Sequence, residues 1–321
     1  TQIPQIIKKH DNEAEVHFLT FSVNKELLLH NPYIDKLITF SKKDGIMAFI
    51  KLVLAVRKEK YDIILDFQDT PRSAQICFFS GAKRRITYDK TRRTYAYNDL
   101  APYLKGTATD IKMSLPAHLY GDKFNVTLED KEPRIFLSEE WQKEADEIIA
   151  KMGFNDNDFI VTIAPTNKKT IKRWKRENYL EMANYLIINY DAKVIITYAP
   201  DEKEYVEGFF KENENLKLLS SGGLGRYAAL LKKSKLNIGS DSAPLHIATA
   251  VQTPTFTILS AGSQGWIFPN GRHTWVRKGM DCQPCKKSYC RISKEAPCIE
   301  NLTLEEVISS LEKFIKNVII V

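Results

Sequence analysis

The residues best suited to chemistry lie in the segment NIGSDSAPLHIATAVQTPTFTIL at positions 237–259. A short apolar run ends at Asp241, and Ser242, a good N-cap, precedes apolar residues at helical spacing. The pattern predicts a strand, a tight turn, a helix and a second strand. Unpaired backbone N–H groups and the positive end of the helix dipole make such a turn an anion site, and phosphate is the obvious ligand. The alternative is a well-capped helix that only packs on a sheet.

Asp241 narrows the class of ligand. A carboxylate beside a bound diphosphate would repel it, so we expect Asp241 to accept hydrogen bonds from the hydroxyl groups of a sugar. His246 lies one turn inside the predicted helix and faces either the ligand or the core. The segment therefore predicts a site for a sugar that is attached to phosphate.

A second polar segment, APTNKKTIKRWKRENY, ends the predicted strand 159–164 and continues beyond it. Its hydroxyl, amide and cationic donors are Thr166, Asn167, Lys168, Lys169, Lys172 and Arg173. They sit at the sheet edge where Asp241 is expected, so they could neutralise a diphosphate. A solvated basic loop is the alternative. We expect Trp174 to pack the loop against its own domain.

Predicted strands and helices alternate along the chain, which favours an α/β fold with mainly parallel, doubly wound sheets. In the first half we expect helix 2–10, strand 14–21, helix 45–59, strand 61–66, helix 71–80, strand 84–88, helix 95–104, strand 133–137 and helix 138–153. In the second half we expect strand 159–164, helix 177–189, strand 192–198, helix 202–212, strand 216–219, helix 224–233, strand 235–239 and a terminal amphipathic helix. Two similar domains with a junction at 155–158 would face each other across a ligand cleft.

The composition is typical of a soluble globular protein and favours an acidic ligand or partner. The chain has 321 residues, 43% of them apolar, and a net charge of +7. No apolar run reaches the length of a membrane span and no signal peptide is recognisable, so we expect a cytosolic protein. A nucleic-acid-binding protein would explain the basic clusters, but no helix-turn-helix, finger or RNP pattern accompanies them. An epimerase or dehydrogenase would need a glycine-rich dinucleotide fingerprint, which the sequence lacks.

The motifs together resemble glycosyltransferase family nine, the lipopolysaccharide heptosyltransferases. The segment GSDSAPLHIATAVQTPTFTIL is similar to the family's D-[ST]-G-x-x-H-x-A-A-A signature. The segments YDIILDFQDTPRSAQICFFSGAKRRITYD, KRWKRENYLEMANYL and CQPCKKSYCRISKEAPCIENLTLEEV resemble further family segments in the family's order. The resemblance spans nearly the whole chain.

The resemblance implies a GT-B enzyme with two Rossmann-like domains. Residues 1–155 would form the acceptor-side domain, 156–302 the nucleotide-sugar domain, and 303–321 a helix packing across the body. The reaction would be inverting, metal-independent transfer of heptose from ADP-heptose to the lipopolysaccharide inner core, without a cofactor. The alternative is another nucleotide sugar or another acceptor glycan on the same fold. The enzyme would be cytoplasmic and peripheral at the inner membrane of a Gram-negative-type bacterium, and nucleic acid would not be a partner.

Residue roles follow from motif positions. Asp241 would position the donor sugar, and the remaining donor-binding residues would be Thr166, Asn167, Lys172, Ser242, Ala243 and His246. The acceptor-binding residues would be Gln68, Arg72, Arg84, Arg85, Arg92 and Arg93, which suit an anionic acceptor at a membrane surface.

Three departures from the family pattern bear on these roles. Ala243 replaces a family glycine, and Pro244 removes one backbone donor from the anion site. Lys217 stands in a strand where some members carry an acid for the ribose. The family begins with a strand and a Gly-Asp loop whose aspartate is the candidate general base, and we do not find them ahead of residues 1–10. We therefore expect the base outside these residues, with Asp66 as a substitute.

Four cysteines form the pattern Cys282-x2-Cys285-x4-Cys290-x7-Cys298. Thiolates at short spacing could ligate zinc or an iron–sulfur cluster, but the clean repeat of a zinc ribbon is missing. We expect reduced thiols in a loop that helps to close the cleft, and no metal. Cys77, in an apolar helix, is expected in the core.

Overall fold

The computed structural model describes residues 1–41, 43–285 and 287–319 and divides the chain into two compact units. Unit 1 runs from Thr1 to Glu132 and unit 2 from Pro133 to Val321. This division precedes the predicted junction at 155–158, because helix α5 (Glu139–Lys151) packs on helix α8 (Leu224–Lys233) of unit 2. Within the described residues, no helix combines the length and apolar character needed to cross a bilayer.

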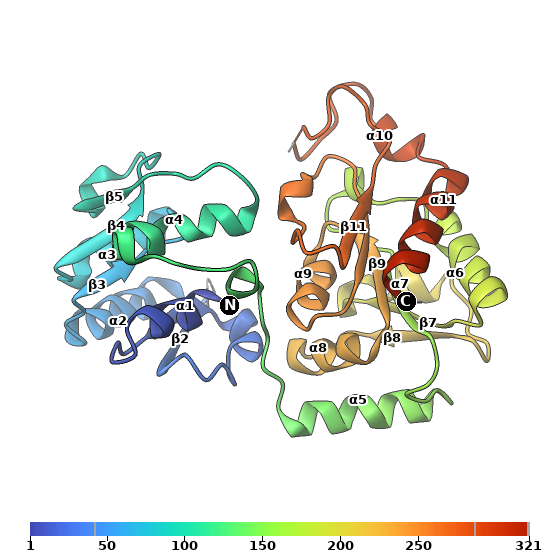
Figure 1. Ribbon diagram of the computed structural model, residues 1–321, viewed down its shortest axis with the longest axis horizontal. Helices are drawn as coiled ribbons and strands as arrows, with labels where there is room; N and C mark the ends of the chain where they lie inside the picture. Colours follow the sequence, from blue (N-terminus) through green and yellow to red (C-terminus); the bar gives the residue numbers. More distant parts are fainter. Residues whose placement is uncertain (42, 286, 320–321) are drawn as a thin grey trace. The chain divides into compact units, whose positions relative to one another are not determined.

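Unit 2 is built on a parallel sheet with the order β11-β10-β9-β6-β7-β8 (Figure 1). The strands are β6 Ile160–Ala164, β7 Lys193–Tyr198, β8 Leu216–Ser220, β9 Leu236–Ser240, β10 Thr255–Ile258 and β11 His273–Val276. Every residue of β6, β9 and β10 is buried. Such continuous burial explains their mainly apolar sequences without polar alternation, since helices cover both faces of a parallel sheet. The buried Asn237 of β9 donates to the Thr162 hydroxyl of β6 at 3.0 Å.

The helices of unit 2 form a layer on each side of this sheet (Figure 1). Besides α5 and α8, they are α6 Arg176–Tyr190, α7 Lys203–Glu207, α9 Ala243–Ala250, α10 Pro297–Glu300 and α11 Leu304–Phe314. The predicted helix 202–212 is shorter, because the backbone leaves the helix at Gly208. The terminal helix α11 continues as a π-helix to Ile319 and packs on α6, β10 and β11, while residues 320–321 lie outside the described part.

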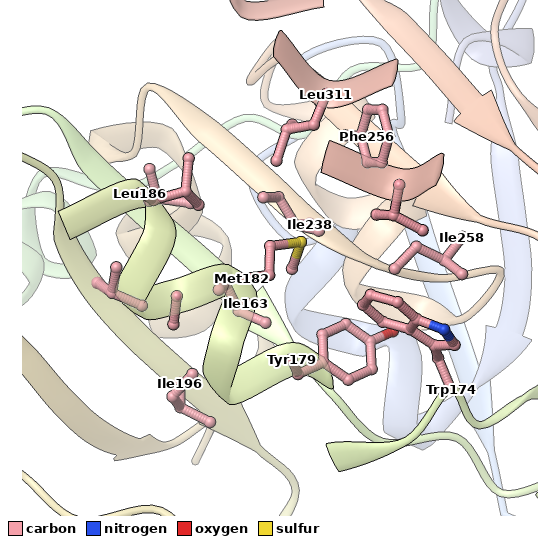
Figure 2. Packing of buried hydrophobic residues seen from close by; sticks show 14 of the residues in the cluster. Ile163, Trp174, Tyr179, Met182, Leu186, Ile196, Ile238, Phe256, Ile258 and Leu311 are labelled. Atoms are coloured by element: carbon pink, nitrogen blue, oxygen red, sulfur yellow. The ribbon is translucent and has the colours of Figure 1, made fainter. Parts of the chain in front are cut away.

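The core of unit 2 lies between the sheet and the layer of α6 and α11 (Figure 2). Trp174 and Tyr179 meet edge to face there, with ring centroids 5.2 Å apart. Trp174 is 1% exposed and its indole Nε1 donates to the carbonyl of Leu302 at 2.8 Å. The prediction that Trp174 packs the basic loop against its own domain is therefore confirmed.

Unit 1 is less regular and contains two parallel sheets, β1-β2 and β3-β4-β5. Its strands are β1 His17–Phe21, β2 Lys36–Phe40, β3 Ile63–Leu65, β4 Arg84–Tyr88 and β5 Asp99–Ala101, and its helices are α1 Ile3–His10, α2 Gly45–Lys58, α3 Pro71–Ser80 and α4 Ala108–Tyr120. Unlike β6 or β9, strands β1 and β3 contain no fully buried residue. The Thr70 hydroxyl and the Ser73 side chain form a capping box that starts α3 where the sequence predicts it.

Several predictions in unit 1 are wrong. Residues 95–104 form a single 3-10 turn and strand β5 in place of a helix, because Asp99–Ala101 pair with β4 and Pro102 follows. Helix α4 was not predicted, since Pro116 lies inside it, yet Thr107 and Asp110 form its capping box. Strand β2 was missed. In unit 2, residues 133–137 are not the strand that the sequence predicts.

Candidate functional site

The candidate donor site lies at the carboxyl edge of the unit 2 sheet, where the strand order reverses. The chain runs outward from β6 through β7 to β8, then returns to the other side of β6 to form β9. The loops after β6 and β9 therefore leave adjacent strands in different directions. Ligands of open α/β sheets bind at such a switch point. The structure brings the two segments predicted from sequence together at this point.

Asn167 joins these two loops. Its amide Nδ2 donates to the Ser240 hydroxyl at 2.9 Å and to the Asp241 carbonyl at 3.2 Å, and its Oδ1 accepts from the backbone N–H of Lys169. Asn167 is 8% exposed, and these hydrogen bonds already engage its side-chain amide within the protein. This geometry gives Asn167 a positioning role for the Asp241 loop, where the sequence analysis expected a direct donor to the ligand.

Gly239 allows the two loops to start close together. A Cβ atom at this position would lie 3.0 Å from the carbonyl oxygen of Ala164, the residue paired with Gly239 in the sheet. The glycine therefore serves a close approach of two backbones.

Asp241 is the electrostatic centre of the site. Its side chain is 12% exposed, its Oδ2 accepts from Lys172 Nζ at 2.5 Å, and its Oδ1 lies 3.6 Å from Nε2 of His246. Burial favours the neutral acid, but the contacts with His246 and Lys172 outweigh it and lower the pKa of Asp241. The carboxylate is therefore ionised at neutral pH and can accept hydrogen bonds from hydroxyl groups.

Helix α9 begins beside this carboxylate. Ser242 occupies the N-cap position, but its hydroxyl donates to the Ser240 carbonyl at 3.2 Å and makes no cap hydrogen bond. Pro244 carries no N–H, so the first turn offers the backbone N–H groups of Ala243 and Leu245. Ala243 is exposed. These groups can bind an anion, as the sequence predicts.

Thr166 is also at this edge, but its hydroxyl is already used. Thr166 Oγ1 donates to Oε2 of Glu202 at 2.6 Å. This Glu202 oxygen also accepts from the backbone N–H of Ala199 at 3.0 Å. Glu202 follows β7, so the loop after a third strand joins the site. The sequence analysis missed Glu202, although its place after a buried strand is the signal that found Asp241.

Gly262 is a second residue that the sequence analysis missed. A Cβ atom there would lie 2.7 Å from Asp241 Oδ2, so only glycine leaves room for the carboxylate. Gly262 belongs to the run SAGS that follows β10, and small residues at that strand end are the signal for it. Trp266 lies nearby, 55% exposed, with its ring in edge contact with His246.

In unit 1, Asp66 ends strand β3 and organises the following turn. It is 5% exposed and accepts from the backbone N–H groups of Gln68 and Asp69 and from the Tyr97 hydroxyl at 2.6 Å. Burial and the hydrogen bond to Asp66 raise the pKa of Tyr97. Three donors thus engage Asp66, which makes it a structural carboxylate and speaks against its use as a general base. Gln68, beside it, is exposed.

Lys112 on α4 also reaches this turn. Its ammonium donates to the carbonyl of Phe67 at 2.9 Å, and burial lowers its pKa while Asp66 opposes the shift. No sequence signal marked Lys112, because its helix was not predicted.

The predicted acceptor-binding arginines do not form one group. Arg84 and Arg85 open β4 and lie at the amino edge of the small sheet, whereas the turn after Asp66 lies at its carboxyl edge. Arg84 donates to Asp99 at 2.6 Å, and Arg85 donates to the backbone carbonyls of Ala82 and Ala96. Parallel pairing alone therefore separates these two arginines from the predicted acceptor side.

The other arginines lie near the carboxyl edge. Arg93 donates to the carbonyl of Asp69 at 2.8 Å and contacts its carboxylate at 3.3 Å. Arg72 and Arg92 are exposed. Of the six predicted acceptor residues, Gln68, Arg72, Arg92 and Arg93 thus share this edge.

The four clustered cysteines form no disulfide bond among the described residues, and Cys77 is buried in the core of unit 1 as predicted. Within the described part of the chain, no group of three or more His, Cys, Asp or Glu side chains is arranged to hold a metal. Backbone N–H groups of Ser293 and Ile292 lower the pKa of Cys290, whereas burial and the neighbouring thiols raise the pKa of Cys298 to about 11. The thiols of Cys290 and Cys298 therefore differ in how readily they ionise.

We expect Cys290 to be alkylated before Cys298 and Cys77, because the thiolate is the reactive form. Limited treatment with iodoacetamide at neutral pH, followed by peptide mass spectrometry, measures the order. Denatured protein is the control and should lose the preference. Equal labelling of Cys290 and Cys77 in the folded protein would refute the assignment.

A protein family and several of its members are similar to this chain in sequence. The family model of glycosyltransferase family 9 (heptosyltransferase) matches residues 49–296. Lipopolysaccharide heptosyltransferase 3 of Escherichia coli is 24% identical over 276 residues, covering 81% of this chain and 79% of the relative. Lipopolysaccharide heptosyltransferase 1 of Campylobacter coli is 22% identical over 331 residues, covering 96% and 92%.

Solved structures agree on the fold. A family 9 glycosyltransferase from Veillonella parvula superposes with a TM-score of 0.86 at 17% identity, covering 98% of this chain and 92% of that one. The ADP-heptose lipopolysaccharide heptosyltransferase II of E. coli gives 0.74 at 15% identity, covering 98% and 93%. The predicted α/β GT-B fold is therefore confirmed. The chain belongs to glycosyltransferase family 9, the heptosyltransferases, and is a glycosyltransferase.

Proposed function

We propose that this enzyme transfers heptose from ADP-heptose to the inner core of lipopolysaccharide, with inversion at the anomeric carbon and without a metal. The observation that carries the proposal is the meeting of Asp241, Lys172 and the start of α9 at the switch point of the unit 2 sheet. Relatives named lipopolysaccharide heptosyltransferases support the substrate class. An E. coli heptosyltransferase with a TM-score of 0.70 was solved with ADP-2-deoxy-2-fluoro heptose, which supports the donor.

The donor's two chemical parts match two parts of the site. Lys172 and the first-turn N–H groups of α9 would bind the diphosphate, since both are donors aimed at an anion. Asp241, with His246 and Ser242 beside it, would accept from the hydroxyl groups of the sugar. Lys172 neutralises Asp241 and so reduces the repulsion between the carboxylate and the diphosphate. Thr166 and Asn167 would hold the loops in place.

Cationic side chains support departure of the nucleotide without a metal. As the bond to the anomeric carbon breaks, negative charge grows on the diphosphate, and Lys172 with the helix start would stabilise it. Exposed Lys168 and Lys169 add positive charge to the same loop.

Inversion requires direct attack by an acceptor hydroxyl whose proton is taken by a base. Asp66 is engaged by three donors, so we do not assign this role to it. The family's Gly-Asp loop stays the predicted place of the base. The acceptor would be an anionic, lipid-linked core sugar, for which Arg72 and Arg92 are exposed candidates, and the enzyme would work at the cytoplasmic face of the inner membrane.

A transfer assay with ADP-heptose and a heptose-deficient lipopolysaccharide core tests the proposal. We expect product formation in the presence of a chelator, and an anomeric configuration opposite to that of the donor by NMR. Transfer from a UDP-sugar or GDP-sugar with no transfer from ADP-heptose would favour the same fold with another donor and would reject the proposal.

Replacing Lys172 with alanine should weaken ADP binding by about 1.5–3 kcal/mol, the range for a lost charged hydrogen bond. The change also leaves the largely buried Asp241 without its cation, which increases repulsion of the diphosphate. Isothermal titration calorimetry measures the affinity. Lys175→Ala is the matched control, because this lysine of the same loop pairs with Glu300 at 2.9 Å. Unchanged ADP affinity in Lys172→Ala would show that the diphosphate binds elsewhere.

A further inference from the structure

Helix α2 in unit 1 carries an apolar face that the rest of the described chain leaves uncovered. Ile46 is 77% exposed, Met47 63%, Ile50 44% and Leu54 59%. The spacing of four between Ile46, Ile50 and Leu54 places them on one side of the helix, with Met47 beside them. A solvent-exposed helix normally presents polar residues on this side, so the face marks an interaction surface.

A second exposed group, of aromatic side chains, lies on helix α3, which packs against α2, and on the 3-10 turn after β4. Phe78, Phe79 and Tyr95 are between 47% and 60% exposed, and Phe78 meets both other rings edge to face. The Arg57 guanidinium at the end of α2 donates to the carbonyl of Phe79 at 3.1 Å, so the ends of the two helices are in contact. We call the exposed apolar side chains of α2 together with these three aromatic rings the α2 face; helices α2 and α3 are drawn in Figure 1.

The charges around the α2 face are mainly positive. The exposed charged side chains from 43 to 60 are Lys43, Lys51, Arg57, Lys58 and Lys60, against Asp44 and Glu59. Glu59 already pairs with Lys36. Lys51 and Lys58 are seven residues apart and therefore line the same border of the apolar face.

We propose that the α2 face docks on the surface of an anionic phospholipid membrane. An exposed apolar helix face bordered by lysine and arginine is the arrangement that lies in a bilayer interface, and aromatic rings favour the same depth. At 14 residues α2 is too short to cross the bilayer, so it would lie in the membrane plane. Two copies of this positive border would repel each other, which favours anionic lipid over a second copy of the chain. The inference rests on the proposed function, because a lipid-linked acceptor requires work at a membrane.

Cosedimentation with vesicles tests the surface. We expect the wild-type protein to bind vesicles of phosphatidylcholine mixed with phosphatidylglycerol, and to bind vesicles of phosphatidylcholine alone more weakly. The double variant Ile50→Ser/Leu54→Ser should bind the mixed vesicles about tenfold or more weakly, since it removes two side chains that would enter the interface. The double variant Lys51→Glu/Lys58→Glu should lose about tenfold as well, and raised salt should remove that difference.

Matched controls come from unit 2. Ile188→Ser changes an isoleucine of α6 that is 80% exposed, and Lys232→Glu reverses an exposed lysine of α8. Both should bind vesicles like the wild type. Circular dichroism and ADP titration of every variant should match the wild type, which shows that folding and the donor site are intact.

Two results would overturn the inference. One is wild-type protein that binds neither kind of vesicle, including the case where light scattering finds a dimer that Ile50→Ser/Leu54→Ser dissociates. The other is vesicle binding by Ile50→Ser/Leu54→Ser equal to that of Ile188→Ser. Because ADP binding is measured separately, wild-type protein that binds ADP but neither kind of vesicle rejects the α2 face alone, whereas wild-type protein that does not bind ADP rejects the proposed function.

Discussion

Replacing Asp241 with alanine should lower heptose transfer by about a hundredfold or more, if its carboxylate holds the donor sugar in the transition state. The structure supplies the physical reason. Asp241 is nearly buried and paired with Lys172, so its carboxylate forms few hydrogen bonds with water. Sugar hydroxyl groups that bind this carboxylate therefore displace little water, which strengthens their hydrogen bonds. Initial rates with ADP-heptose at saturating acceptor measure the effect.

The variants around Asp241 separate charge from shape. Asp241→Asn keeps the size but removes the charge, and should lose nearly as much activity as Asp241→Ala. Asp201→Ala is the matched control, because Asp201 is an exposed acid after β7 and lies outside the predicted site. A transfer rate of Asp241→Ala equal to that of the wild type would reject the role.

The lowered pKa of Asp241 determines how the stability that its ionised carboxylate contributes changes with pH. A folded-state pKa below the ordinary value of 3.8 means that the stability contributed by the ionised group is fully present above that value. It is lost as the pH falls through the lower folded-state pKa. Asp241 should therefore leave the neutral part of the pH–rate profile flat.

Replacing Trp174 with alanine should lower the free energy of unfolding of unit 2 by about 3–5 kcal/mol. The indole is 1% exposed in the main core of unit 2 (Figure 2), and its removal would leave a cavity there. It would also leave the buried carbonyl of Leu302 without its donor. Trp174→Phe keeps part of the packing and should lose less, about 1–3 kcal/mol, chiefly from that unpaired carbonyl.

Urea denaturation followed by tryptophan fluorescence measures this loss. All four tryptophans of the sequence lie in unit 2, so the signal reports that unit. Trp266→Ala is the matched control, because Trp266 is 55% exposed and should change the free energy of unfolding by less than about 0.5 kcal/mol. Equal midpoints for Trp174→Ala and Trp266→Ala would contradict the packing described for the loop.

The sequence predicts unit 2 better than unit 1 for a physical reason. Strands such as β6 and β9 are buried on both faces and appear in the sequence as short, mainly apolar runs. Strand β5 has three residues, and its pairing with β4 decides its structure. Local preference could not reveal that, nor a helix such as α4 that contains a proline.

At the candidate site, too, the sequence predicts which segments meet but not which of their side chains are free to bind a ligand. The rule that parallel strands end at one edge is enough to bring Asp241 and Lys172 together. It does not tell which donors are already used, and Asn167 and Thr166 turn out to bind other protein groups. Arg84 and Arg85 are close to Asp66 in the sequence, but they begin strand β4 and therefore lie at the opposite edge of the small sheet from the turn after Asp66.

A crystal structure with ADP-2-deoxy-2-fluoro heptose tests most directly whether the donor binds at the switch point of unit 2. We predict the diphosphate in hydrogen-bond contact with Lys172 and the first turn of α9, and the sugar hydroxyl groups on Asp241. A ligand bound away from these groups, or Asp241 still paired only with Lys172 while the sugar lies elsewhere, would contradict it.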